Sequence, residues 1–142
     1  MRYDRWDITP FDGAKIVTFV GTRLLVIRRD DDPAIPWPGH WDFPGGGREP
    51  GEGAVACALR ETREEVGLTL SPADLTWRRF YATPIRVWFF AARLSVARAA
   101  EVRLGDEGQE WTLMTPADYL ADDHAIPHFA DRLREMLADG WG

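Results

Sequence analysis

The chain has 142 residues, of which 45% are hydrophobic and 28% charged, and its formal net charge at pH 7 is −6. This length and balance predict one globular domain over residues 1–142, large enough to bury a core. The acidic charge argues against binding a long nucleic-acid polymer, which depends on neutralising many phosphates. It is compatible with a small phosphorylated ligand, because a bound metal ion can supply the positive charge.

Cys57 is the only cysteine, so the chain has no internal disulfide framework and suits a reducing compartment. We interpret Cys57 as a small packing residue rather than a nucleophile, since no local motif supports the second role. Residues 1–4 show no apolar start of a secretory signal, and the longest apolar run, 87–92, is too short to span a bilayer. The expectation is a cytoplasmic protein without a membrane partner.

The first half of the chain predicts strands. Residues 15–19 and 23–29 are rich in β-branched and aliphatic side chains, which indicates a hairpin or two adjacent strands. Residues 30–40 contain three prolines and predict a surface loop. A short strand over 41–43 then leads into Pro44-Gly45-Gly46-Gly47, where the backbone must turn or approach another group closely.

The second half mixes helices with strands. Residues 52–66 give the clearest helix, and Gly67 is suited to end it in a left-handed conformation. The remaining predicted elements are strands at 75–81, 85–94 and 110–113, one helical turn at 116–120 and an amphipathic closing helix at 126–139. This order predicts an α+β fold class, an α/β/α sandwich with a mixed β-sheet between helices.

Three carboxylates share one face of the predicted helix. With about 100° per residue, Glu61, Glu64 and Glu65 fall on one arc, beside the apolar arc that faces the core. Clustered like charges cost a few tenths of a kcal/mol per pair unless something neutralises them. A hard divalent cation would do so, since Mg²⁺ prefers oxygen ligands. The plain alternative is a solvated acidic face balanced by Arg60 and Arg63.

A longer motif surrounds this face. It runs from Gly46 through five residues to Glu52, then through seven residues to Arg60-Glu61-Thr62-Arg63-Glu64-Glu65-Val66-Gly67-Leu68. It resembles the Nudix signature Gly-x5-Glu-x7-Arg-Glu-U-x-Glu-Glu-x-Gly-U, in which U is bulky and apolar. Eight of the nine specified positions are met, and Thr62 departs at an apolar position. The chain therefore resembles a Nudix hydrolase, and the resemblance implies a Nudix-type sandwich.

The resemblance also implies roles for the motif residues. The metal ligands, for Mg²⁺ or Mn²⁺, would be Glu61, Glu64, Glu65 and, directly or from a supporting position, Glu52. Arg60 would orient these carboxylates through charge-assisted hydrogen bonds, and Gly46 would let the backbone pass close to the metal site. The residue that activates water is left open among Glu64, Glu65 and a residue outside the motif. Glu107, in a segment that resembles a late loop of MutT-type enzymes, is a candidate.

Further segments resemble MutT-type nucleoside triphosphate pyrophosphohydrolases. By that likeness Arg29 would contact the substrate, with Phe43 and Trp88 as aromatic neighbours. The aromatic positions could equally be core packing. Ala125 stands where MutT enzymes place the asparagine that reads the oxidised purine. Since alanine has no side-chain donor or acceptor, we expect a permissive enzyme, unless a neighbour such as His124 reads the base.

The leading functional prediction is hydrolysis of a phosphoanhydride bond in nucleoside triphosphates or related nucleoside diphosphate derivatives, releasing nucleoside monophosphate and pyrophosphate. One alternative is removal of the 5′ pyrophosphate from RNA, which the acidic charge and lack of a basic run disfavour. A second is a catalytically silent Nudix module that senses a ligand, although no carboxylate of the motif is replaced. The expected partner is a small nucleotide, and the sequence leaves monomer and homodimer open.

Overall fold

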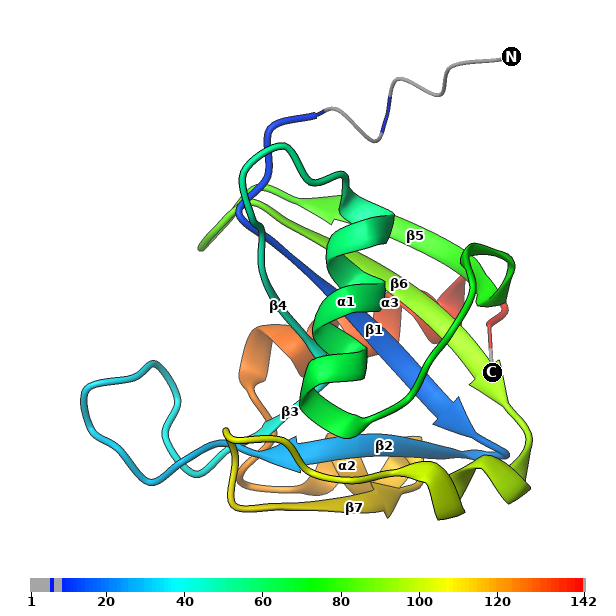
Figure 1. Cartoon of the computed structure of the whole chain (residues 1–142). Coiled ribbons are helices and arrows are strands. Elements are labelled where there is room, and N and C mark those ends of the chain that lie inside the picture. The colour runs from blue at the N-terminus through cyan, green and yellow to red at the C-terminus, as the bar shows by residue number, and fades with distance from the viewer. Residues whose placement is uncertain (1–5, 7–8, 142) are drawn as a thin grey trace.

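A computed structural model describes residues 6 and 9–141; residues 1–4, in which no secretory signal was expected, lie outside them. Its centre is a seven-stranded mixed sheet with the order β3-β2-β1-β6-β5, in which β4 pairs with β1 and β7 with β2 (Figure 1). The strands are β1 (Gly13–Val20), β2 (Arg23–Arg28), β3 (Trp41–Asp42), β4 (Gly45–Gly47), β5 (Leu75–Tyr81), β6 (Val87–Leu94) and β7 (Glu110–Met114). The β1–β6 pairing is parallel and the other pairings are antiparallel.

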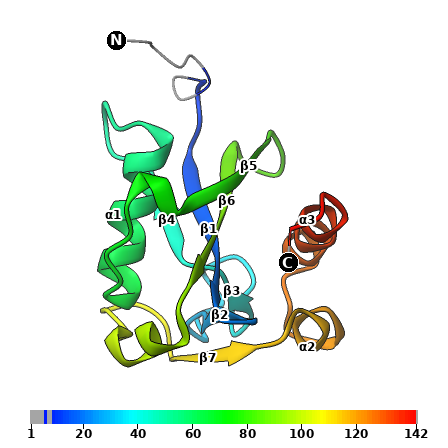
Figure 2. The same ribbon diagram turned by 90° about the vertical axis from the view of Figure 1, so that its right-hand side faces the viewer.

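Helices cover both faces of the sheet. Figure 2 shows α1 (Ala54–Val66) on one side and α2 (Pro116–Ala121) with α3 (Pro127–Ala138) on the other. Two clusters of buried apolar side chains correspond to these two interfaces. This confirms the predicted sandwich of helices around a mixed sheet. None of the helices within residues 9–141 is long and apolar enough to cross a membrane.

The central strands explain the two cores. Along β1, Ile16 belongs to the cluster under α1, whereas Val17 and Phe19 belong to the cluster under α3. Its parallel neighbour β6 divides in the same way, with Phe90 on the first side and Phe89 on the second. Successive strand residues point to opposite faces, so a strand buried on both faces needs an almost unbroken apolar run.

Helix α1 begins two residues later than predicted. Its N-terminal cap is Gly53, and Glu52 stays in the preceding turn, where its amide donates to the carbonyl of Glu49 at 3.1 Å. Gly67 ends the helix as expected, with a φ of 75° and its N–H bonded to the Arg63 carbonyl. The later start places Glu52 on a separate segment from the other motif glutamates.

Other differences from the predicted elements lie in the connections between strands and helices. The strand predicted from residue 85 begins at Val87, because the segment before it forms a turn with a cis Thr83–Pro84 bond. Two short 3₁₀ helices, Pro72–Asp74 and Val96–Glu101, were not predicted. Both are irregular connections without a clear apolar period, which is the signal on which helix prediction depends.

Candidate active site

Arg60 joins the acidic residues of the motif into one network. Its Nε donates to Glu52 Oε2 at 2.7 Å and its Nη2 to Glu52 Oε1 at 2.9 Å. Its Nη1 donates to Glu61 at 2.9 Å and to Glu64 at 3.1 Å, and Nη2 also reaches the Gly47 carbonyl at 2.9 Å. The guanidinium therefore fixes the orientation of three carboxylates, because its planar donors match them in direction.

The pairing of Glu52 with Arg60 shifts the pKa of both side chains. The hydrogen bonds from Arg60 lower the pKa of Glu52 to about 2, against the opposing effect of partial burial. The same contact raises the pKa of Arg60 above its ordinary value. The bidentate geometry favours the charged form of each partner, so this pair stays ionised throughout the neutral range.

Gly46 leaves room for the carboxylate of Glu61. A Cβ at position 46 would lie 2.5 Å from Glu61 Oε2, so a side chain there would displace that carboxylate. The contact arises because β4 runs between β1 and α1, with Gly46 paired to Ala14. Cys57 lies fully buried on the same side of α1, with its Sγ 3.6 Å from the Gly46 carbonyl. Cys57 is thus a packing residue, as expected.

Glu65 is the deeply placed carboxylate of α1. Its Oε1 is buried and has no hydrogen-bond partner among the described residues. Burial raises its pKa to about 8, and although Lys15 opposes the shift, Asp42, Glu61 and Glu107 add to it. A buried carboxylate oxygen without a donor is destabilising unless a proton or a cation sits on it. Its oxygen chemistry suits a hard divalent ion.

A cavity of about 190 Å³ gathers the acidic side chains; it is lined by Glu61, Glu64, Glu65, Asp106 and Glu107. Within the part of the chain that the structure describes, no three of these side chains converge closely enough to form a finished metal cage. Mg²⁺ typically takes only one or two carboxylates, together with water and substrate phosphates. The residues therefore fit such an ion. Asp106 was not predicted, because it lies in a loop with no periodic pattern.

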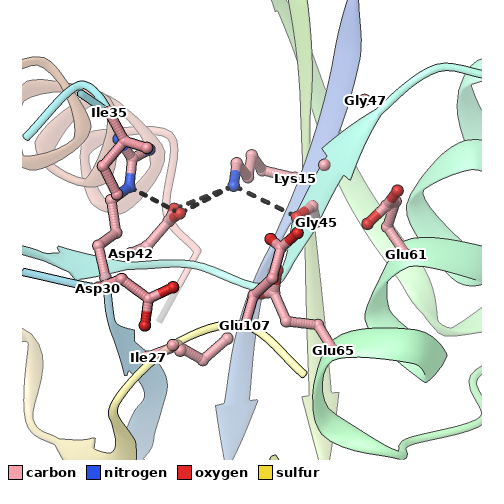
Figure 3. A pocket seen from close by; sticks show the side chains of 13 residues that line it. Lys15, Ile27, Asp30, Ile35, Asp42, Gly45, Gly47, Glu61, Glu65 and Glu107 are labelled. Atoms are coloured by element: carbon pink, nitrogen blue, oxygen red, sulfur yellow. Dashed lines mark hydrogen bonds and ion pairs between the residues drawn. The ribbon is translucent and has the colours of Figure 1, made fainter. Parts of the chain in front are cut away.

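A second cavity, of about 360 Å³, adjoins the first and shares Glu61, Glu65 and Glu107 with it. Figure 3 shows Glu61 and Glu65 extending from α1 on one side, with Asp42 and Lys15 on the other. The remaining lining residues are Ile27, Arg29, Asp30, Ile35, Gly45, Gly46, Gly47 and Gly108. Cations and carboxylates thus face each other across one space.

The far wall of this cavity is held by Asp42. Lys15 Nζ lies 3.0 and 3.1 Å from its two carboxylate oxygens, and Arg29 Nε donates to Oδ2 at 3.0 Å. Lys15 also donates to the carbonyls of Phe43 and Gly45, both at 3.4 Å. Lys15 was not singled out from the sequence, because a lysine within an apolar strand gives no sign of which loop will face it.

Most of the predicted site residues lie in or directly behind the two cavities. Arg29, Gly46, Glu61, Glu65 and Glu107 line the larger cavity, and Glu64 lines the smaller one. Glu52 and Arg60 brace them from behind.

The predicted contacts of Phe43, Trp88 and Ala125 with substrate do not match their placement. Phe43 is fully buried under α3, with its ring centroid 5.7 Å from that of Phe129. Trp88 is 7% exposed and packs on the other face of the sheet. Ala125 is 9% exposed and bridges to Trp41. The apolar side chains of these three residues are those of core positions, which explains why they are buried.

Comparisons with known proteins identify the family of this chain. A model of the NUDIX domain matches residues 10–137. Nucleoside triphosphatase NudI of Escherichia coli is 30% identical over 110 residues, which cover 70% of this chain and 77% of that protein.

Solved structures share the fold. The MutT protein from Methanosarcina mazei Go1 superposes with a TM-score of 0.74 at 22% identity, covering 92% of this chain and 94% of that one. A C. elegans Ap4A hydrolase binary complex gives 0.68 at 28% identity, covering 89% and 96%. With the family model spanning most of its length, the chain belongs to the Nudix hydrolase family.

Proposed function

We propose that this chain hydrolyses a phosphoanhydride bond in nucleoside triphosphates or related nucleoside diphosphate derivatives. The products would be nucleoside monophosphate with pyrophosphate from a triphosphate, and nucleoside monophosphate with the phosphorylated remainder from a diphosphate derivative. The observation that carries the proposal is the pair of adjoining cavities of opposite character. One is lined by five carboxylates, and the other adds Lys15 and Arg29. A polyphosphate with a bound cation needs both kinds of surface. The likeness to a nucleoside triphosphatase over 77% of its length supports this substrate class.

Glu61, Glu64 and Glu65 are the proposed ligands of Mg²⁺ or Mn²⁺, with Glu52 as a further ligand or as a support acting through Arg60. When bound, the ion would neutralise phosphate charge and lower the pKa of an attacking water. The partnerless oxygen of Glu65 and the space that Gly46 leaves for Glu61 support this assignment. Arg60 would keep Glu61 and Glu64 turned toward the cavity by its hydrogen bonds.

Lys15 and Arg29 are the proposed phosphate contacts in the larger cavity. Both are held in place by Asp42, so little side-chain freedom is lost when an anion arrives. Glu107 lines both cavities, as Glu61 and Glu65 do, and it comes from a loop outside α1. It is therefore a candidate, beside Glu64 and Glu65, for removing the proton of the attacking water.

A panel of nucleotides tests the proposal. Nucleoside triphosphates, nucleoside diphosphate derivatives, Ap4A and 5′-triphosphorylated RNA are incubated with Mg²⁺, and products are identified by chromatography. The expected result is turnover of nucleoside triphosphates to monophosphate and pyrophosphate, and of the other small nucleotides to the two phosphorylated halves left by one phosphoanhydride cut. Turnover should be abolished by a chelator and restored by Mg²⁺ or Mn²⁺. Full turnover in excess chelator would exclude the metal role.

Two outcomes favour the alternatives. Nucleotide binding without turnover by any member of the panel would indicate a ligand-sensing module. Faster turnover of the RNA than of every small nucleotide would indicate an RNA pyrophosphohydrolase. Glu65→Gln is the control in each assay, because it preserves size while removing a carboxylate that lines both cavities.

A further inference from the structure

One aromatic side chain is exposed in the loop that borders the larger cavity. Trp37 lies in the loop between β2 and β3 and is 39% exposed, whereas Phe43 and Trp88 are buried. It is the only exposed tryptophan among the described residues; the others are buried or partly buried. None of the described residues that line the cavity is aromatic. An aromatic contact with a ligand bound there would therefore come from a neighbouring residue.

The loop that carries Trp37 is firmly anchored. The Arg29 amide donates to the His40 carbonyl at 2.9 Å, and Arg29 Nη1 donates to the Pro36 carbonyl at 2.6 Å. Arg28 Nε donates to the Gly39 carbonyl at 3.2 Å. Trp37 itself has a φ of 51°, which bulky residues rarely adopt unless their surroundings enforce it. The backbone that carries the indole is therefore held in place before any ligand arrives.

All three histidines of the chain gather around this indole. The Trp37 ring centroid lies 5.2 Å from that of His40 and 6.2 Å from that of His128, which begins α3. His124 extends the cluster, 5.5 Å from His40. The histidine rings meet Trp37 at 67° and 51°, so neither stacks parallel to it. The cluster is thus an aromatic surface with an exposed ring, assembled from the loop and from α3.

The loop that carries part of this aromatic surface also lines the larger cavity. Asp30 and Ile35, from the same loop, line the cavity, and so does Arg29. The Arg29 guanidinium that binds Pro36 also lies 5.9 Å from the ring centroid of Phe129, the neighbour of His128. One residue therefore contacts the cavity, the loop and the start of α3. A ligand with its phosphates in the cavity can therefore extend along this loop toward Trp37.

We propose that Trp37, with His40 and His128, forms a platform that stacks on the nucleobase of the substrate. The assignment rests on the proposed function for the phosphate half of the ligand. An aromatic ring meets the π-face of any base, so stacking binds purines and pyrimidines alike. The platform thereby gives a structural basis for the permissive specificity expected from the sequence.

Equilibrium binding tests the platform without requiring turnover. Adenosine monophosphate, cytidine monophosphate and ribose 5-phosphate are titrated by calorimetry into the parent, Trp37→Gly and Trp37→Phe. Glycine removes the ring and accepts the positive φ without strain, whereas phenylalanine keeps a ring. Base–aromatic stacking typically contributes enough to change affinity by about 5- to 150-fold. We expect Trp37→Gly to lose about tenfold for both nucleotides and nothing for ribose 5-phosphate, with Trp37→Phe within about threefold of the parent.

Val96→Ala is the matched control. Val96 is 66% exposed and lies beside Gly21, at the opposite end of β2 from the loop, so its loss should change no affinity. Unchanged nucleotide binding by Trp37→Gly overturns the platform. An equal loss for nucleotides and ribose 5-phosphate also overturns it, because the indole would then only hold the loop. A parent that turns over no nucleotide but shows the predicted difference refutes the proposed function and supports the platform.

Discussion

The two sides of the larger cavity are charge-reversed counterparts. On the α1 side one cation, Arg60, lies among the carboxylates of Glu52, Glu61 and Glu64. On the opposite side one carboxylate, Asp42, lies between two cations, Lys15 and Arg29. Each central group holds its partners by charge-assisted hydrogen bonds, and Glu61 on one side and Lys15 and Arg29 on the other line the larger cavity. The comparison indicates that each side is preorganised separately, one for a cation and one for an anion.

The two sides differ in how the chain builds them. Glu61, Glu64 and Glu65 come from neighbouring turns of one helix, so helical spacing alone brings them together. Lys15, Arg29 and Asp42 come from β1, the end of β2 and β3, and meet only when the sheet forms. The first side is therefore set by local spacing in the chain, whereas the second depends on the tertiary fold.

The largest expected effect is on the α1 side. Glu64→Gln and Glu65→Gln should each lower kcat by about 10²–10⁴-fold, the range typical of losing a group that activates or aligns the attacking water. The fold should survive, because glutamine matches glutamate in size and helix propensity. Steady-state kinetics and far-UV circular dichroism measure the two properties. Glu101→Gln, which removes a glutamate paired with Arg98 outside the site, is the control. Activity within a few-fold of the parent in both variants would show that these two residues only form a solvated acidic face of the helix.

Substitutions at two adjacent glycines distinguish an effect on the position of Glu61 from an effect on folding. In Gly46→Ala the new methyl group meets the flexible end of Glu61, so we expect a stable protein with kcat reduced about 10²-fold. In Gly45→Ala the methyl group meets the backbone of Ala14 and Lys15 at a φ of 140°, so the melting temperature should fall sharply. Thermal unfolding and kinetics on both variants check this contrast. A stable Gly45→Ala, or a fully active Gly46→Ala, would contradict the assigned contacts.

The same contrast explains what the sequence predicts. The mixed-sheet sandwich and the α1 carboxylates follow from periodicity and a spaced motif, both local in the chain. Lys15 and Asp106 were missed, since their position depends on how distant segments meet. Phe43 and Trp88 were expected at the substrate and lie in the core. An aromatic residue near the motif looks the same in either place, and only the packing of distant segments around it decides between them, since Phe43 and Trp88 are buried on opposite faces of the sheet.

Arg29→Ala should have a moderate effect, on the other side of the cavity. The substitution removes a cation from the phosphate side but leaves Lys15 paired with Asp42. KM should rise about tenfold for many nucleotides with little change in kcat, provided that the contact is equally strong in ground and transition states. Arg23→Ala, at the exposed start of β2, is the control. If kcat falls while KM holds, Arg29 acts on the transition state instead.

The smallest expected effect is a pH dependence of stability at Glu52. Its folded pKa is about 2 because Arg60 donates to both carboxylate oxygens, against 4.5 for an unperturbed glutamate. A depressed pKa stabilises the folded state fully above pH 4.5, and this contribution is lost as the pH falls from 4.5 toward 2. Glu52→Gln should therefore be less stable than the parent by about 1–2 kcal/mol at pH 7, with the difference shrinking toward zero near pH 2. Urea denaturation of both proteins at pH 7, 4 and 3 measures it, and comparing the two cancels the titration of every other carboxylate. A difference that stays constant between pH 7 and pH 3 would mean that the Glu52–Arg60 pair stabilises the turn before α1 by packing rather than by charge.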